Sequence, residues 1–366
     1  MKTLIFEIGV EEMPAAAAEF GVAKIKSETE ELLHAFRLLE SGSSTTVESY
    51  GTPRRLILIV RGLPEKQASA VAEIKGPPKR VAFTQDGSPA PAAVGFAKNQ
   101  GVEVGELQIR EADGGEYLFA VKQHPGLPTF EILPEILGTL LKSLEFTKSM
   151  RWGGGQVRFI RPVRWLLALF GADEISIELE GLKSGRLTYG HRFLVDEPIE
   201  IEDADDYLKK IGEAKVVIDA QTRSETISRL IETEAEKAGG RAAINPKVLG
   251  EVAYLVEDPH VVVGTFDEEF LKIPRAATVT AMEAHQRYFP VEGSDGNLLP
   301  LFIVAHNGDP QYGDQIARGH ERVLRARLAD AAFFFHEDSR TTLESKVDRL
   351  KSVVWQAKLG TVFSKV

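Results

Sequence analysis

The 366-residue sequence contains no cysteine. This absence excludes disulfide bonds, thiolate zinc sites and cysteine nucleophiles. Long apolar runs are missing too: the longest, from Trp165 to Phe170, is far shorter than the roughly 20 residues that span a bilayer. The first residues, MKTLIFEIGVEEMP, lack the long apolar core and small-residue cleavage site of a secretory signal. We therefore expect a cytoplasmic protein that does not engage a membrane.

Familiar catalytic motifs are also missing. The sequence has no Walker loop, no GxGxxG fingerprint and no GxSxG elbow. The triple glycine at 153–155 is not followed by the lysine and serine that a phosphate loop needs. The eight histidines have no partners at metal-ligand spacing. We predict no catalytic residue, no metal ligand and no cofactor bound by this chain.

Charge is distributed unevenly along the chain, whose net charge is −10. Residues 193–260 hold 16 Asp and Glu against 8 Lys and Arg, and so supply most of the acidic excess. A nucleic acid would be repelled from such a segment and attracted to basic regions elsewhere. We therefore expect residues 193–260 to face away from any RNA.

The most unusual segment runs from 146 to 172, FTKSMRWGGGQVRFIRPVRWLLALFGA, and contains no acidic residue. Arginine suits phosphate because its planar fork donates two parallel hydrogen bonds, and tryptophan offers a face on which bases stack. A solvated amphipathic face would give the same pattern. The contact candidates in this segment are Lys148, Arg151, Arg158, Arg161 and Arg164.

Four further basic motifs yield candidates. TPRRL at 52–56 should lie at the exposed mouth of a turn before a buried strand; GHRF at 190–193 and HQRYF at 285–289 are weak signals alone. In the last motif, three arginines at helical spacing lie away from an apolar stripe that ends in three consecutive phenylalanines, 333–335. Instead of contacting a partner, the basic residues of each motif could form a structural salt bridge or cap a helix. These candidates are Arg54, Arg55, His191, Arg192, His285, Arg287, Arg318, Arg322 and Arg325.

Hydrophobic periodicity predicts a multidomain α+β protein. We expect an α/β domain at 1–172 with a small β-rich insertion at about 66–125, an α+β domain at 173–310, and a helical connector at 311–366. The insertion is inferred from its dense Gly and Pro residues. Predicted strands are 3–8, 56–60, 165–170, 175–179, 215–218, 261–263 and 301–304, and predicted helices are 15–39, 91–99, 129–144 and 222–238.

Taken together, the motifs resemble one family. FEIGVEEMPA at 6–15, TPRRL, KGPP, MRWG, RFIRPVRWLLALFG, GHRF, HQRYFPV and GHERVLRARLADAAFFFHED occur in the order found in the beta subunit of the bacterial tetrameric (α2β2) glycyl-tRNA synthetase. The resemblance runs from residue 3 to the end of the chain.

The resemblance implies a subunit of an ATP-dependent ligase that attaches glycine to tRNA(Gly). In that family the alpha subunit forms the adenylate and uses ATP and Mg, whereas the beta subunit binds tRNA. The implied partners are thus the alpha subunit and tRNA(Gly), with no DNA. The family continues past KLGTV into further domains, so we expect this chain to be an N-terminal portion. Its 173–310 region would resemble the middle of the phenylalanyl enzyme's beta subunit.

Without the family resemblance, the residues alone are compatible with two classes of function. The first is a tRNA-binding and assembly subunit of a synthetase. The second is a scaffold, a non-catalytic RNA-binding protein or an independent hydrolase, unrelated to aminoacylation. A synthetase subunit predicts salt-dependent RNA binding, whereas a protein-only scaffold whose arginines serve folding predicts none.

Overall fold

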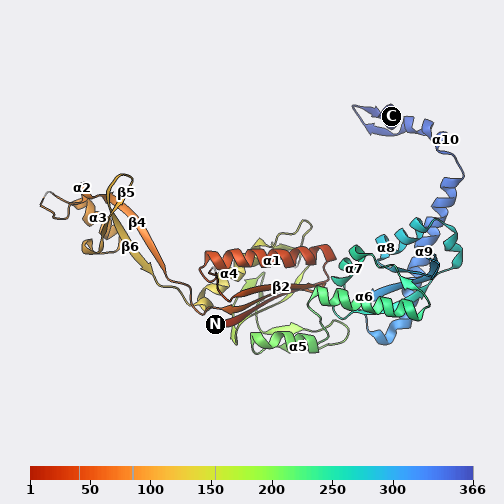
Figure 1. Ribbon diagram of the computed structural model, residues 1–366, viewed down its shortest axis with the longest axis horizontal. Helices are drawn as coiled ribbons and strands as arrows, with labels where there is room; N and C mark the ends of the chain where they lie inside the picture. Colours follow the sequence, from red (N-terminus) through yellow and green to blue (C-terminus); the bar gives the residue numbers. More distant parts are fainter. Residues whose placement is uncertain (41, 85, 153, 366) are drawn as a thin grey trace.

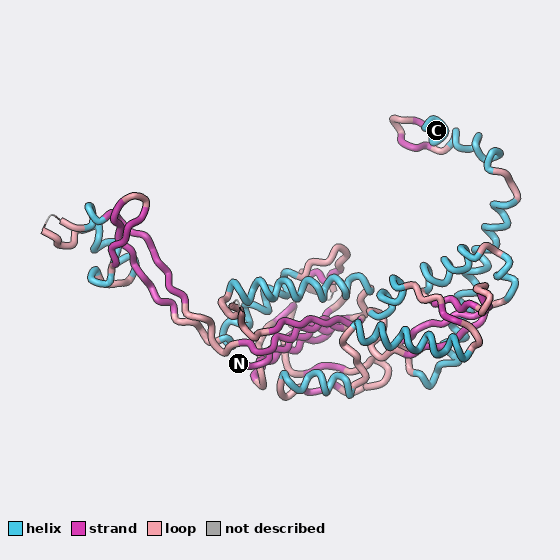
Figure 2. Tube along the Cα trace, viewed as in Figure 1, coloured by secondary structure: helices cyan, strands magenta, loops and turns pink. Residues whose placement is uncertain are grey.

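A computed structural model describes residues 1–40, 42–84, 86–152 and 154–365. The molecule is elongated, with two sheet-containing bodies side by side, an arm at one end and a C-terminal tail at the other (Figure 1). Strands and helices alternate through both bodies, which makes the protein a mixed α+β structure with several antiparallel sheets (Figure 2). Among the described helices, none is both long and apolar enough to cross a membrane.

The first body is built on a five-stranded antiparallel sheet. Its central strand β1 (Lys2–Val10) pairs with β3 (Arg55–Leu63) on one side and β9 (Val163–Phe170) on the other. These strands are continuous apolar runs because both faces of the sheet are covered. The edges are β2 (Thr46–Thr52) and β10 (Asp173–Glu174).

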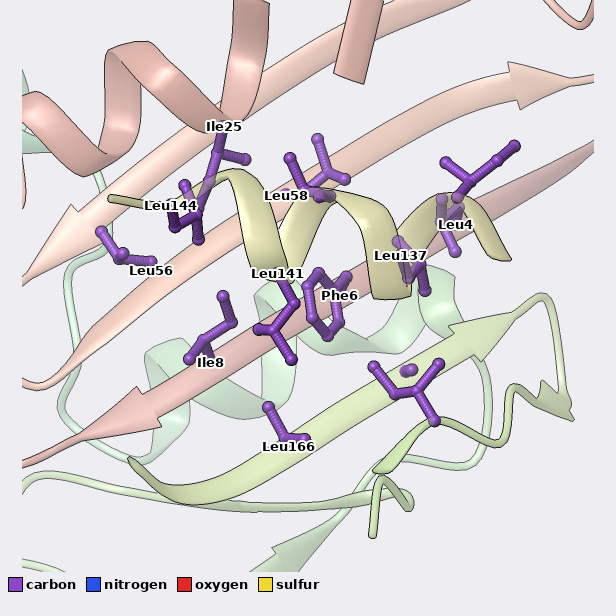
Figure 3. Packing of buried hydrophobic residues seen from close by; sticks show 14 of the residues in the cluster. Leu4, Phe6, Ile8, Ile25, Leu56, Leu58, Leu137, Leu141, Leu144 and Leu166 are labelled. Carbon is purple, nitrogen blue, oxygen red and sulfur yellow. The ribbon is translucent and has the colours of Figure 1, made fainter. Parts of the chain in front are cut away.

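Two helices, α1 (Ala15–Ala35) and α4 (Thr129–Ser143), cover one face of this sheet. The apolar side of α4 buries Leu137 and Leu141 against Phe6 and Leu58 of the sheet (Figure 3). The opposite face is covered by η2 (Ala204–Asp206) and α5 (Tyr207–Glu213), with Tyr207 fully buried. The sheet is therefore the middle layer of three.

Three short two-stranded hairpins lie on the surface of the first body in its described part. They contain the basic residues Arg151 and Arg158 and the aromatic residue Tyr189. They are β7 (Met150–Arg151) with β8 (Arg158–Phe159), β11 (Glu178–Leu179) with β12 (Leu182–Lys183), and β13 (Leu187–Tyr189) with β14 (Pro198–Glu200).

An arm projects from the first body between β3 and α4 (Figure 1). Its core is small, centred on Ala82, Ala93 and Leu118. Helix α3 starts with Pro91 at its first turn and ends at Gly101 with φ 67°, the left-handed conformation that glycine adopts without strain. The elements are β4 (Ala70–Pro78), α2 (Lys79–Ala82), α3 (Pro91–Gln100), η1 (Val104–Glu106), β5 (Gln108–Ala112) and β6 (Gly115–His124), with β6 central in the sheet.

The second body is a four-stranded antiparallel sheet between two pairs of helices. Its strand order is β15 (Arg241–Ala242), β17 (Phe289–Glu292), β18 (Leu298–His306) and β16 (His260–Thr265). One face packs on α6 (Ala220–Lys237) and α7 (Pro246–Ala253). The other packs on η3 (Glu268–Lys272), α8 (Arg275–Gln286) and α9 (Gly313–Ser339), which follows η4 (Pro310–Tyr312). Asp219 caps α6 by accepting a hydrogen bond from Thr222 N.

The C-terminal tail leaves the second body along the exposed end of α9 (Figure 1). Phe333, Phe334 and Phe335 are 60%, 63% and 37% exposed. Beyond them the chain is not entirely helical, since a two-stranded hairpin forms at 354–361. The tail elements are α10 (Leu343–Val347), η5 (Asp348–Ser352), β19 (Val354–Gln356), β20 (Gly360–Thr361) and α11 (Val362–Lys365).

Core packing divides the chain at different places from those expected. Residues 175–218 pack on the first sheet, and the two hydrophobic cores of the first body extend to Ile218 rather than ending near 172. The predicted strand at 215–218 is wrong, because Val216 and Ile218 are buried outside any sheet ladder. Leu324 and Leu328 of α9 are buried in the core of the second body, so the expected connector packs on that body through these two residues.

Candidate nucleic-acid interface

Arg55 lies inside the protein, contrary to the exposed turn that TPRRL suggested. Its guanidinium is 0% exposed and pairs with Glu7 at 3.2 Å and Glu257 at 2.9 Å, both also 0% exposed. Burial lowers its pKa, but the two carboxylates outweigh burial and raise it above the ordinary arginine value. Glu257 comes from the second body, so Arg55 ties the two bodies together and is withdrawn from the contact candidates.

A second buried arginine, Arg223 of α6, crosses the same junction. It donates to three backbone carbonyls, those of Ala253, Val217 and Gly51, at 2.6, 2.5 and 2.7 Å. Burial lowers its pKa to about 10, still well above neutrality. Together with Arg55 it forms a buried, hydrogen-bonded junction between the bodies.

His191 is another interior residue among the sequence candidates. It is 0% exposed; its Nε2 lies 2.9 Å from Asn307 Oδ1, and its Nδ1 accepts a hydrogen bond from Phe193 N. With Nδ1 accepting, Nε2 is the ring nitrogen placed to donate to Asn307 Oδ1. Asn307 Oδ1 also accepts from the backbone N of Glu257 and Asp258. His191 therefore positions the loop that follows it and does not face solvent.

The basic hairpin, defined as residues 148–158 with β7 and β8, has the opposite character. Lys148, Arg151 and Arg158 are all exposed. Arg158 donates to Ser149 Oγ and Ser149 O, and no salt bridge to these three residues occurs within the described part of the chain. The triple-glycine motif begins at Gly153, which lies outside the described residues. Unpaired exposed cations of this kind attract phosphate.

A second group, the arginine cluster, gathers Arg161, Arg164 and Arg192 around the chain after β1. Arg164 pairs with Glu11 at 3.4 Å, and Arg192 contacts Glu11 and Glu12 at 3.6 and 3.3 Å. Arg161 donates to Glu12 O at 3.0 Å. Such exposed pairs contribute at most about 1 kcal/mol each, so a phosphate can replace the carboxylate. The structure thus joins two motifs that are 28 residues or more apart.

Arg54 is intermediate in exposure between the buried Arg55 and the exposed arginines of the hairpin. It is partly buried, with its guanidinium 5.6 Å from the Trp165 ring, and burial lowers its pKa. Trp165 itself is only 6% exposed and donates to Glu7 Oε1. Trp165 therefore offers little ring surface for base stacking, whereas Tyr189, which packs on it at 4.9 Å between ring centroids, is 38% exposed.

The remaining candidates lie on the second body. His285 is exposed near the end of α8, and Arg287 pairs with Glu251 at 3.1 Å while adopting φ 58° as the helix cap. On α9, Arg318 and Arg322 are exposed without a carboxylate partner among the described residues, whereas Arg325 pairs with Asp267 at 3.2 Å. Glu321 does not pair with its arginine neighbours, because it accepts from Thr265 N and Oγ1.

The described residues contain no group of three or more His, Asp or Glu side chains placed to hold a metal ion. Sequence reasoning missed two exposed aromatics at the junction of the bodies, Phe193 and Tyr312, at 58% and 56% exposure. No local pattern distinguishes an exposed loop aromatic from a buried one, so only the fold reveals them.

Residues 4–366 match the family described as the glycyl-tRNA synthetase beta subunit. The glycine–tRNA ligase beta subunits of Moorella thermoacetica and Desulforamulus reducens are 46% and 43% identical to this chain over its full length. That of Synechocystis sp. is 43% identical, also over the full length. The chain spans about half the length of these curated relatives, 52%, 52% and 51% respectively. It belongs to the glycyl-tRNA synthetase beta-subunit family.

Proposed function

We propose that this chain provides an RNA-binding surface and an assembly platform for glycine–tRNA ligase, supporting ATP-dependent attachment of glycine to tRNA(Gly) by a separate alpha subunit. The observation that carries the proposal is the basic hairpin: Lys148, Arg151 and Arg158 are exposed cations without carboxylate partners among the described residues. Family membership supplies the reaction in which such a surface would serve.

The arginine cluster extends this surface toward the junction of the bodies. Arg161 lies two residues after β8, so Arg158, Arg161 and Arg164 follow one another along the chain. Arg164 and Arg192 keep 60% and 42% of their side chains exposed even while paired. Bidentate arginine–phosphate contacts are stronger than these exposed carboxylate pairs, which supports RNA as the occupant.

The family resemblance implies that the alpha subunit forms the adenylate, so we propose that ATP and Mg are used there and not by this chain. Glycine-dependent ATP–pyrophosphate exchange by the purified chain alone would contradict this division of labour.

The test is to mix the purified chain separately with tRNA(Gly) and with alpha subunit. Binding to tRNA should weaken linearly in log affinity against log salt, as expected when phosphate contacts release counterions. A complex with alpha subunit should be visible by light scattering. The proposal fails if neither complex forms. If the chain binds the alpha subunit but not tRNA(Gly), it is a protein scaffold and the RNA-binding part of the proposal is wrong.

A further inference from the structure

A groove of about 730 Å³ lies where the GHRF loop of the first body meets the start of α9 in the second. Its lining contains two large exposed aromatics, Phe193 and Tyr312, at 58% and 56% exposure. Two glutamines, Gln311 and Gln315, and the backbone around Gly308 complete most of the remaining wall. We infer that this groove holds an unpaired RNA nucleobase, a role that rests on the RNA binding proposed above. Phe193 is the first residue of the acidic segment 193–260, so the expectation that this segment faces away from RNA then applies only to the residues that follow Phe193.

The chemistry of the lining fits a base. Aromatic faces stack on any nucleobase, and an amide side chain offers both a donor and an acceptor to its edge. Gln315 is exposed and makes no side-chain hydrogen bond within the described residues. Asp309 is already engaged, since it accepts from Gln311 N and from the Gln311 side chain at the start of η4.

The groove has a rigid base. His191 accepts from Phe193 N and contacts Asn307, while the backbone N of Leu194 and Val195 donate to His191 O. Asn307 directly precedes Gly308 of the groove wall. Both sides of the groove are therefore anchored to the same buried histidine, which holds the aromatic side chains ready for a ligand.

Cations neighbour the lining residues along the chain. Arg192 directly precedes Phe193 and pairs with Glu11 and Glu12, whereas Arg318 lies one helical turn beyond Gln315 on α9 without a carboxylate partner among the described residues. A nucleotide in a chain is joined to a phosphate on its 5′ and on its 3′ side, so cations next to both aromatic walls suit one stacked nucleotide once phosphate displaces the exposed carboxylates from Arg192. This charge arrangement favours RNA over an apolar segment of protein as the occupant.

The groove between α8 and α9 provides a contrast. At about 630 Å³ it is similar in size and also has two exposed phenylalanines, Phe334 and Phe335. Its other walls are four alanines, Thr280, His285, Arg327, Asp330 and Asp338, so it has basic side chains as well as carboxylates but no amide side chain. A change at Phe334 therefore removes an exposed aromatic face where no amide is available to a base edge, and serves as the control.

The test compares Phe193→Ala/Tyr312→Ala with Phe334→Ala, using tRNA(Gly) and a labelled single-stranded RNA oligonucleotide. Loss of stacking should weaken single-stranded RNA binding about tenfold or more, while the salt slope stays unchanged because no cation is removed. Tyr312→Phe, which keeps the stacking face, should bind normally. A 4-thiouridine-containing RNA should crosslink to the peptides holding Phe193 or Tyr312 in the unaltered chain.

The outcomes separate the two proposals. If the unaltered chain binds no RNA, the proposed function and this inference both fail. RNA binding that persists in the double variant, with no crosslink at either peptide, overturns the groove alone. If the double variant keeps RNA affinity but loses alpha subunit, the groove is a protein-binding site and the inference is wrong. Equal loss in Phe334→Ala would show a non-specific effect and also overturn it.

Discussion

Arginine has opposite surroundings in two regions of this molecule. At the junction of the bodies, Arg55 and Arg223 are fully buried and bonded to carboxylates or carbonyls. On the basic hairpin, Arg151 and Arg158 face solvent without a carboxylate partner among the described residues. The first pair holds the structure together, whereas the second is free to meet a phosphate. The sequence motifs made Arg55 a contact candidate alongside Arg151 and Arg158, although Arg55 is buried.

The largest effect is expected inside the junction. Arg55→Met would leave Glu7 and Glu257 buried without their cation, and breaking a buried ion pair in this way costs about 3–5 kcal/mol. Urea unfolding should show that loss, while Arg158→Met at the exposed hairpin should change stability by no more than about 0.5 kcal/mol. Similar small effects for both variants would remove the distinction between the regions.

The next largest effect is a pH dependence of folding stability, caused by the buried His306. Burial, with the nearby His260 and His320, lowers the pKa of His306 to about 4, against 6.5 ordinarily. Between these values the unfolded chain binds a proton that the folded protein does not, so stability falls as pH falls from 6.5 toward 4. The full loss approaches about 3 kcal/mol, and the contribution is complete above pH 6.5.

Unfolding measured between pH 7 and 5 tests this in the unaltered chain and in His306→Gln. The variant should show a shallower decline, because its side chain does not titrate. His336→Gln on exposed α9 is the control and should keep the original slope. An unchanged slope in His306→Gln would show that the interior histidine does not govern acid stability.

The smallest effect is expected on the arm. Residues 66–125 hold seven Lys and Arg and seven Asp and Glu, so their formal charges cancel. Arg110 pairs with Glu73 at 2.7 Å, and both side chains are more than 40% exposed. Arg110→Ala should alter stability by less than about 1 kcal/mol and leave the salt slope of RNA binding unchanged. A reduced slope would extend the RNA surface onto the arm.

Sequence patterns predicted the continuous apolar strands and amphipathic helices well, because the local spacing of apolar residues indicates which side of an element is buried. The pattern LILIV at 56–60 and the stripe of α4 both form the first core. Tertiary pairing has no such local signal. Arg55 is interior only because Glu7 and Glu257, 48 and 202 residues away, meet it in the fold.

The site was predictable to a similar extent. The lack of acidic residues within 146–172 was visible in the sequence, and the cations of the hairpin are exposed in the structure. The fold nevertheless brings Glu180 to the hairpin, where its carboxylate accepts from Gln156 N and Val157 N. Their contact with RNA stays a prediction. His191 shows the opposite case: its string resembles a polar surface motif, yet the side chain is buried against Asn307. Burial of a polar residue depends on distant partners, which a short motif does not contain.

The central claim is that exposed arginines bind RNA whereas buried arginines hold the fold. Its most direct test is the salt dependence of tRNA(Gly) binding by the triple variant Lys148→Ala/Arg151→Ala/Arg158→Ala. Each phosphate contact removed should lower the slope of log affinity against log salt by about one, so we predict a decrease of about two to three with an unchanged unfolding midpoint. A folded triple variant with the original slope and affinity would contradict the account.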